Sequence, residues 1–248
     1  MLSNRASKFI KSLQLKKFRQ SEGQFVVEGA KNVTELINSE LSITDLFVTK
    51  EFADAHVDFL KNVEFDIVKE TNLTKIGSLK TNNAALAVVR IPEKESLNLN
   101  EGCTLALDRI KDPGNLGTII RIADWYGIQQ IICSPDSVDC YNPKVISATM
   151  GSFTRVQVHY HKLEPLAEQA HMTYATSLDG ESILKMQAIE PSIVFFGNES
   201  TGLDKQIQSL ARKKIKIPGY GHAESLNVAV SVGVFCDNFM RILNKNKN

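Results

Sequence analysis

Residues 104–126 read TLALDRIKDPGNLGTIIRIADWY and set the architecture of the chain. A short apolar strand, Thr104 to Leu107, runs into an Asp-Pro-Gly turn, and an apolar pattern of helical period follows from Leu116 to Tyr126. The N-terminus of a helix carries backbone N–H groups without partners, so this turn favours a polar or anionic ligand. Alternatively, Asn115 only caps the helix. The stretch therefore predicts a strand-turn-helix motif with a candidate ligand site at the turn.

The alternation of β-branched strands and helical patterns continues in both directions, which is typical of an α/β fold with parallel strands. In the second half, strands are expected at Thr104–Leu107, Gln130–Cys133, Thr154–His159, Met172–Thr176, Ile193–Phe196 and Lys214–Ile217, and helices at Leu116–Tyr126, Pro143–Met150, Lys205–Ala211 and Leu226–Leu243. In the first half, strands are expected at Phe25–Val27, Ile43–Val48 and Ala84–Ile91, and helices at Lys31–Asn38 and Phe52–Lys61. Gly151 is expected to form a left-handed cap after the helix that begins at Pro143.

Chain length and one polar segment indicate two domains. A chain of 248 residues accommodates a domain of about 90 residues followed by one of about 150. The segment Pro92-Glu93-Lys94-Glu95-Ser96 is polar, begins with proline and follows an expected strand. We therefore expect a first domain at 1–92, a linker at 93–100 and a second domain at 101–248.

Composition excludes several classes of protein. The chain is 43% apolar and 23% charged, unlike a mainly disordered or collagen-like chain. Met1 to Lys11 contains no apolar run, so no signal peptide is expected, and the longest apolar run, Val228 to Cys236, is too short to cross a bilayer. These features lead us to expect a cytoplasmic protein.

The cysteines predict no metal site and no disulfide framework. The chain contains no CxxC motif and no paired His/Cys spacing, so buried reduced thiols are expected. The four cysteines are Cys103, Cys133, Cys140 and Cys236.

Positive charge is concentrated at the N-terminus. The net charge is only +1, which does not by itself indicate a nucleic-acid partner. Residues 1–20, however, hold six cations and no acidic residue: Arg5, Lys8, Lys11, Lys16, Lys17 and Arg19. Two interpretations are open, a solvated basic helix or a surface that contacts the phosphates of a nucleic acid.

Two further stretches join an expected strand end to a helix. Residues 195–203 read FFGNESTGL, in which Gly197 lets a ligand approach the backbone and Glu199 projects from the loop. Residues 217–227 read IPGYGHAESLN and open the last helix. Capping by Ser200 or Thr201 in the first stretch, and by Ser225 or Asn227 in the second, is the alternative.

Together the three stretches indicate a ligand site at the carboxyl ends of parallel strands. The chain contains neither a GxGxxG motif nor a GxxxxGK[ST] loop, which argues against dinucleotide binding and P-loop functions. The last helix is apolar almost all round at its start, so it is expected to be buried within the domain or against a second subunit.

In these three stretches the sequence resembles the SpoU (TrmH) family of RNA ribose 2′-O-methyltransferases, within the SPOUT superfamily. The PGNxG turn and following arginine of the family fall on Asn115 and Arg121, its FGxExxGL stretch on residues 196–203, and its IPM-to-SLNV stretch on residues 217–228. The match covers roughly Thr104 to Leu243. The chain departs from the family pattern at Gly219, where many relatives have methionine, and at Thr149, where serine is common.

The resemblance implies an α/β SPOUT domain with a deep trefoil knot, a homodimer with sites at the subunit interface, and S-adenosylmethionine as cofactor. The segment Phe25-Val26-Val27-Glu28-Gly29 and the helix after it resemble the ribosomal-protein-like substrate-binding domain of the family. Such a domain favours ribosomal RNA of the 23S type. A tRNA substrate, or a non-catalytic RNA-binding or ribosome-assembly protein with this fold, is the alternative.

The resemblance also implies roles for individual residues. It assigns cofactor contacts to Gly197, Ile217 and Leu226, and catalysis to Asn115, Arg121, Glu199, Ser225 and Asn227. It further makes Arg5, Lys8, Lys16, Lys17 and Arg19 the RNA-binding candidates. A guanidinium stays protonated in proteins, so the arginine is better suited to hold a phosphate and stabilise a developing alkoxide than to act as the base. Asn115 is expected to orient the arginine or the ribose, and the glutamate is the alternative base.

Overall fold

The computed structural model describes residues 2–93, 95–99, 102–186 and 191–245. The chain forms two compact units: unit 1 contains Met1–Glu93 and Asp139–Thr154, and unit 2 contains Lys94–Val138 and Arg155–Asn248. The segment Asp139–Thr154 belongs to unit 1, although the sequence places it inside the expected second domain. The expected linker, 93–100, falls partly outside the described residues, at 94 and 100.

Unit 1 is built on a four-stranded sheet in the order β1-β4-β2-β3. The strands are β1 (Gln24–Glu28), β2 (Ile43–Val48), β3 (Asp66–Ile67) and β4 (Ala85–Arg90). β4 runs antiparallel to both of its neighbours, and only β2 and β3 are parallel. The expectation of parallel strands is wrong here, because β1 and β4 are apolar and buried on both faces, and such a run does not reveal the direction of its strand.

Helices bury both faces of this sheet. They are α1 (Asn4–Ser12), α2 (Lys16–Glu22), α3 (Ala30–Ile37), α4 (Lys50–Ala55), α5 (Val57–Leu60), α6 (Glu70–Ile76) and α8 (Pro143–Thr149). Phe25 and Val27 of β1 share a core with Val33 of α3. Val26, between them, faces the opposite core with Ile10 and Leu73. This alternation is the period-2 pattern of a strand buried on both faces.

The helix expected at Phe52–Lys61 is two helices, because the chain turns at His56. The backbone of His56 is non-helical, with φ −126° and ψ 32°. Its Nδ1 lies 3.0 Å from the carbonyl oxygen of Phe52, and its ring stacks on the Phe52 ring at 4.1 Å. The imidazole therefore takes the place of the backbone N–H of His56, which would bond to the Phe52 carbonyl if the helix continued.

Helix α8 completes the core of unit 1 from a distant part of the sequence. Ile146 is 2% exposed among residues of β1, α3 and β4. The Tyr141 ring lies 4.6 Å from the Phe25 ring. The left-handed cap expected at Gly151 begins one residue earlier, at Met150 (φ 53°), and continues into Gly151 (φ 102°).

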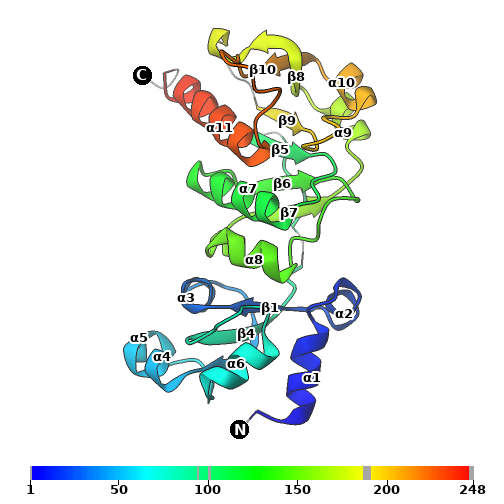
Figure 1. Ribbon diagram of the computed structural model, residues 1–248. Helices are drawn as coiled ribbons and strands as arrows, with labels where there is room; N and C mark the ends of the chain where they lie inside the picture. The colour runs from blue at the N-terminus through cyan, green and yellow to red at the C-terminus, as the bar shows by residue number, and fades with distance from the viewer. Residues whose placement is uncertain (1, 94, 100–101, 187–190, 246–248) are drawn as a thin grey trace. The chain divides into compact units, whose positions relative to one another are not determined.

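Unit 2 contains a parallel six-stranded sheet in the order β10-β8-β9-β5-β6-β7, as the sequence predicts (Figure 1). Its strands are β5 (Cys103–Leu107), β6 (Gln130–Cys133), β7 (Gln157–Tyr160), β8 (Thr173–Ser182), β9 (Ser192–Phe196) and β10 (Lys213–Lys216). Its α-helices are α7 (Pro113–Trp125), α9 (Glu164–Gln169), α10 (Lys205–Leu210) and α11 (Val228–Lys245). The trefoil knot remains a prediction.

The helices of unit 2 cover the two faces of the central strands. Phe195 of β9 packs with residues of α9 and α10. Phe196 points to the other face, where its ring meets Phe235 of α11 at 5.3 Å. α11 lies against α7 on that face (Figure 1). Val232 and Phe239 of α11 are buried, whereas Val230 is 53% exposed, so the apolar start of α11 is only partly covered.

Two physical limits apply to the described part of the chain. None of its helices combines the length and apolar character that a membrane span needs. It also brings together no group of three or more His, Cys, Asp or Glu side chains that could hold a metal ion.

Candidate active site

The turn after β5 starts α7 earlier than expected and frees Asn115 from capping. α7 begins at Pro113, and Asp112 is its N-cap, since the Asp112 Oδ1 accepts the backbone N–H of Asn115 at 2.8 Å. Proline suits this first position because its missing N–H would have no helical partner. The Asn115 side chain is therefore available for other contacts.

Three side chains form one hydrogen-bonded chain: one from the first turn of α7, one from the loop after β9 and one from the residue before α11. Asn115 donates through Nδ2 to a carboxylate oxygen of Glu199, and its Oδ1 accepts from the Nδ2 of Asn227 at 3.0 Å. Asn227 also caps α11, because its Oδ1 accepts the backbone N–H of Ala229 at 2.9 Å. Capping and network formation are thus both functions of Asn227. The fold brings together one residue from each of the three sequence stretches.

The loop after β9 is a tight turn that Gly197 makes possible. Asn198 and Gly202 exchange backbone hydrogen bonds of 3.1 and 2.9 Å, and Gly202 has a φ of 68°. A Cβ on Gly197 would lie 2.0 Å from the backbone nitrogen of Leu203. The sequence predicts a glycine that admits a ligand, but the close neighbour is the chain itself. The caps expected at Ser200 and Thr201 are absent from the described α10, which Asp204 caps instead.

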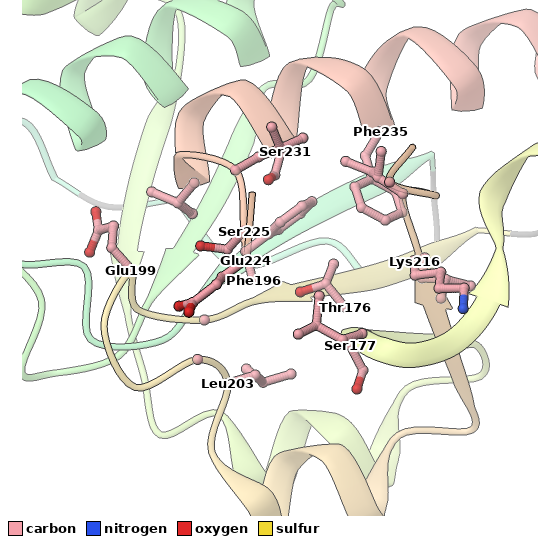
Figure 2. Close-up of a pocket in the computed structure, with 18 of the residues that line it drawn as sticks. Thr176, Ser177, Phe196, Glu199, Leu203, Lys216, Glu224, Ser225, Ser231 and Phe235 are labelled. Atoms are coloured by element: carbon pink, nitrogen blue, oxygen red, sulfur yellow. The ribbon is translucent and has the colours of Figure 1, made fainter. Parts of the chain in front are cut away.

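A cavity of about 870 Å³ opens beside this network. Five of the predicted site residues line it: Gly197, Glu199, Ile217, Ser225 and Leu226. Phe196, Leu203 and Phe235 supply apolar surface, while Thr176, Ser177 and Lys216 add polar groups. In the view of Figure 2, Glu199 lies at one end of the cavity and Lys216 at the other, with Glu224 and Ser225 between them. This volume and mixed lining suit a small organic ligand with polar and apolar parts.

One wall of the cavity comes from a bulge in β8 that the sequence analysis missed. β8 extends to Ser182, and its register with β10 jumps so that Lys214 pairs with Ala175 and Ile215 with Glu181. The intervening residues 176–179 line the cavity. Gly180 permits the close approach of β10, since a Cβ there would lie 2.6 Å from the Ile215 nitrogen. A glycine inside a strand pattern was the available signal.

Arg121 lies apart from the network. It is exposed on α7, and its guanidinium forms no hydrogen bond or ion pair with any residue that the structure describes. It comes six positions after Asn115, which places it roughly 9 Å further along the helix axis and on a different side of the helix. Asn115 therefore makes no contact with Arg121 of the same chain, and its other expected role, orienting the ribose, stays a prediction.

Asp108 and Arg109 form a second cluster, which the sequence did not predict as part of the site and which is hydrogen-bonded to the loop after β9. The Arg109 guanidinium donates to the Asp108 carboxylate at 2.7–3.1 Å, and Asp108 is 4% exposed. The hydrogen bond to Asp108 raises the pKa of Arg109 above its ordinary value. Arg109 has a φ of 55°, a left-handed conformation that costs a side-chain-bearing residue roughly 1–2 kcal/mol.

The basic N-terminal candidates divide into two groups. Arg5 and Lys8 on α1, and Lys16 and Lys17 on α2, are exposed. Arg19 is 2% exposed, and its guanidinium binds Asp139 at 2.6 Å and the carbonyl oxygens of Leu13 and Gln14. The prediction that Arg19 contacts RNA is therefore wrong, since its charge holds the α1–α2 turn to the segment 139–154.

Comparison with known families adds to this geometry. Residues 102–237 match the SpoU rRNA Methylase family, over the whole of the cavity and its network. The chain belongs to that family. The resemblance seen in the three stretches is confirmed, and this SpoU methylase is an RNA methyltransferase whose methyl donor is S-adenosylmethionine. Residues 4–87 match the MRM3-like substrate binding domain.

Three relatives of this SpoU methylase resemble it over nearly the whole chain. The 23S rRNA (guanosine(2553)-2′-O)-methyltransferase RlmP of Bacillus subtilis is 28% identical over 93% of this chain and 94% of its own. A TrmH-family structure from Porphyromonas gingivalis is 32% identical, with a TM-score of 0.86 over 97% and 99% of the two chains. An AdoMet-bound rRNA methyltransferase from Sinorhizobium meliloti is 27% identical, with a TM-score of 0.85 over 98% and 97%.

Proposed function

We propose that this SpoU methylase transfers a methyl group from S-adenosylmethionine to a ribose 2′-hydroxyl of 23S-type ribosomal RNA. The observation that carries the proposal is the joining of Asn115, Glu199 and Asn227 at the rim of the cavity. The likeness to RlmP over both units supports ribosomal RNA as the substrate class. The proposal places the protein in the cytoplasm, with the ribosomes it would modify.

The residues of the cavity fit the cofactor. Phe196, Leu203 and Phe235 offer apolar surface to an aromatic base, and the backbone groups of Gly197, Ile217 and Leu226 offer hydrogen bonds at close range. When bound, the sulfonium group of S-adenosylmethionine supplies the electrophilic methyl group. The charge of Glu199 at the rim favours a cationic sulfonium nearby.

The network can hold and activate a ribose hydroxyl. Asn115 is oriented by its two partners, because its Oδ1 accepts from Asn227 and its Nδ2 donates to Glu199. The second carboxylate oxygen of Glu199 remains to accept a hydrogen bond from the 2′-hydroxyl and receive its proton. Ser225, exposed on the same rim, can bind the neighbouring sugar-phosphate. The role of these side chains is mainly to position the nucleophile for in-line attack.

The exposed side chains of unit 1 supply an RNA-binding surface in this proposal. Arg5, Lys8, Lys16 and Lys17 carry four cations on α1 and α2. Cations of this kind contribute affinity for phosphates without reading sequence. The choice of nucleotide then depends on where the RNA meets the cavity.

The reactive unit is proposed to be a homodimer. Arg121 lies on a different side of α7 from Asn115, so in this proposal the partner subunit's Arg121 holds an RNA phosphate at the site. Two large apolar side chains are exposed on α7 and α11: Trp125 of α7 is 84% exposed, and Val230 of α11 is 53% exposed. Burial against a second copy would remove this apolar surface from water.

Methyl transfer to defined RNA tests the substrate and the atom. Ribosomal RNA and tRNA transcripts are incubated separately with labelled S-adenosylmethionine, and the product nucleotide is digested and identified. A 2′-O-methylated nucleotide in ribosomal RNA alone is expected. Methylation of a base, or of tRNA alone, would contradict the proposal.

Mixing two inactive variants tests the dimer. Asn115→Ala and Arg121→Ala each remove one group, and randomly exchanged dimers of the two contain one complete site in half of the molecules. About a quarter of wild-type activity should return on mixing if the arginine acts across the interface. No recovery, with exchange verified by mass, would place the arginine in its own chain's site.

A further inference from the structure

Arg109 is held in its left-handed conformation from both sides of the peptide chain. Its backbone N–H donates to the Ser134 Oγ at 2.8 Å, and its carbonyl oxygen accepts from the Asn198 Nδ2 at 2.8 Å. Apart from glycines, only Met150 shares this conformation among the described residues. Strained residues persist where several neighbours fix them, and they gather at functional sites.

The side chain of Arg109 contacts the loop 198–204, which its backbone carbonyl also contacts. One guanidinium nitrogen lies 3.4 Å from the carbonyl oxygen of Gly202, and the Asp108 carboxylate that it binds accepts the backbone N–H of Asp204 at 3.0 Å. Asn198, Gly202 and Asp204 are thus tied to residues 108–109. These attachments lie on both sides of Glu199.

Glu199 itself has little else to fix it. It is exposed, and Asn115 is the hydrogen-bond partner that the described residues give it. Its carboxylate can meet Asn115 only if the loop 198–204 keeps its place, and a displacement near 1 Å can cost about 10²-fold in rate. The position of this carboxylate therefore depends on groups that never touch the substrate.

We propose that Arg109 is a positioning residue that acts through Glu199, by holding the loop 198–204 so that the carboxylate meets Asn115. This inference rests on the role of Glu199 in the proposed function. Neither the Arg109–Asp108 ion pair nor the strained backbone of Arg109 is needed to hold β5 in the sheet, since β5 is already paired with β6 and β9.

The test is a double-mutant cycle measured as kcat at saturating S-adenosylmethionine and RNA. Arg109→Gly removes the side chain while allowing the left-handed backbone, and it should lower kcat at least about 10-fold. In a Glu199→Gln background the same change should lower kcat by less than about 2-fold, because the group it positions is gone. Equal factors in the two backgrounds would overturn the proposal.

The single variants separate this inference from the proposed function. Glu199→Gln at wild-type kcat would overturn the role of Glu199 itself. A low kcat for Glu199→Gln, combined with equal Arg109→Gly factors, would overturn only the role of Arg109. A rise in KM for RNA without a change in kcat would instead make Arg109 an RNA contact.

A second variant and a control guard against a folding defect. Arg109→Lys keeps the charge but not the fork that spans the Asp108 carboxylate and the Gly202 carbonyl, so kcat should fall between wild type and Arg109→Gly. Arg212→Ala removes an exposed arginine whose side chain contacts the carbonyl oxygen of Ala170. This control should keep wild-type kcat and unfolding temperature. An Arg109→Lys variant with wild-type kcat would overturn the need for the fork.

Discussion

Two regions at the cavity differ in how many hydrogen bonds hold them in place. The bonded wall comprises residues 197–204, most of which line the cavity, and residues 108–117, which do not line it but are hydrogen-bonded to them. Its Asp108, Arg109, Asn115 and Asn198 each form two or more hydrogen bonds. The open wall, residues 218–226, forms no hydrogen bond with another described residue, and 219–226 are all exposed. Asn227 joins the two walls through Asn115. Catalytic groups must be held in fixed positions, whereas entry of a ligand requires a segment that can move.

The largest effect should come from a substitution at Gly197, where the bonded wall packs most closely against its own backbone at Leu203. Gly197→Ala places a Cβ 2.0 Å from a backbone nitrogen, so the loop must shift and Glu199 with it. We expect a loss of about 2–3 kcal/mol in the free energy of unfolding and of most activity.

Gly219→Ala is the matched substitution in the open wall, where an added Cβ has no neighbour within 4 Å. Calorimetric scans of both variants check the comparison, and the unfolding temperature of Gly219→Ala should equal that of the wild type. Equal destabilisation by the two alanines would remove the distinction between the walls.

The junction at Asn227 should show an intermediate effect that separates two functions. Asn227→Ala removes both the cap of α11 and the bond to Asn115, which should cost about 1 kcal/mol of stability and at least about 10-fold in kcat. Asn227→Ser keeps a capping oxygen but cannot reach Asn115. It should recover the stability measured by urea unfolding without recovering kcat. Recovery of both would show that Asn227 only caps.

The smallest effect is a change in amide exchange without any mutation. S-adenosylmethionine should slow hydrogen exchange severalfold at residues 219–227, since their amides lack partners in the described structure, and should change residues 198–204 much less. Exchange measured by mass spectrometry with and without the cofactor checks this. Equal protection of the two walls would show that the bonded wall is also mobile.

The strands and turns of unit 2 were predictable because each depends on neighbouring residues. Alternating apolar runs and Asp-Pro-Gly or glycine turns carry local signals, and all six strands of its sheet were expected. The short elements β3, α6 and α9 were not expected, since a few residues give no clear period. The direction of β4 in unit 1 could not be read, because both of its faces are buried.

The sequence by itself determined the family, the parallel sheet of unit 2 and the three stretches that meet at the site. Only the tertiary structure decided which side chains form hydrogen bonds and ion pairs with one another. It buried Arg19 against Asp139, placed Arg121 away from Asn115, and gave residues 139–154 to unit 1. The physical reason is that charge and helical period are properties of short segments. A partner 84 or 120 residues away, as for Asn115 and Arg19, exists only once strands from distant segments are packed side by side.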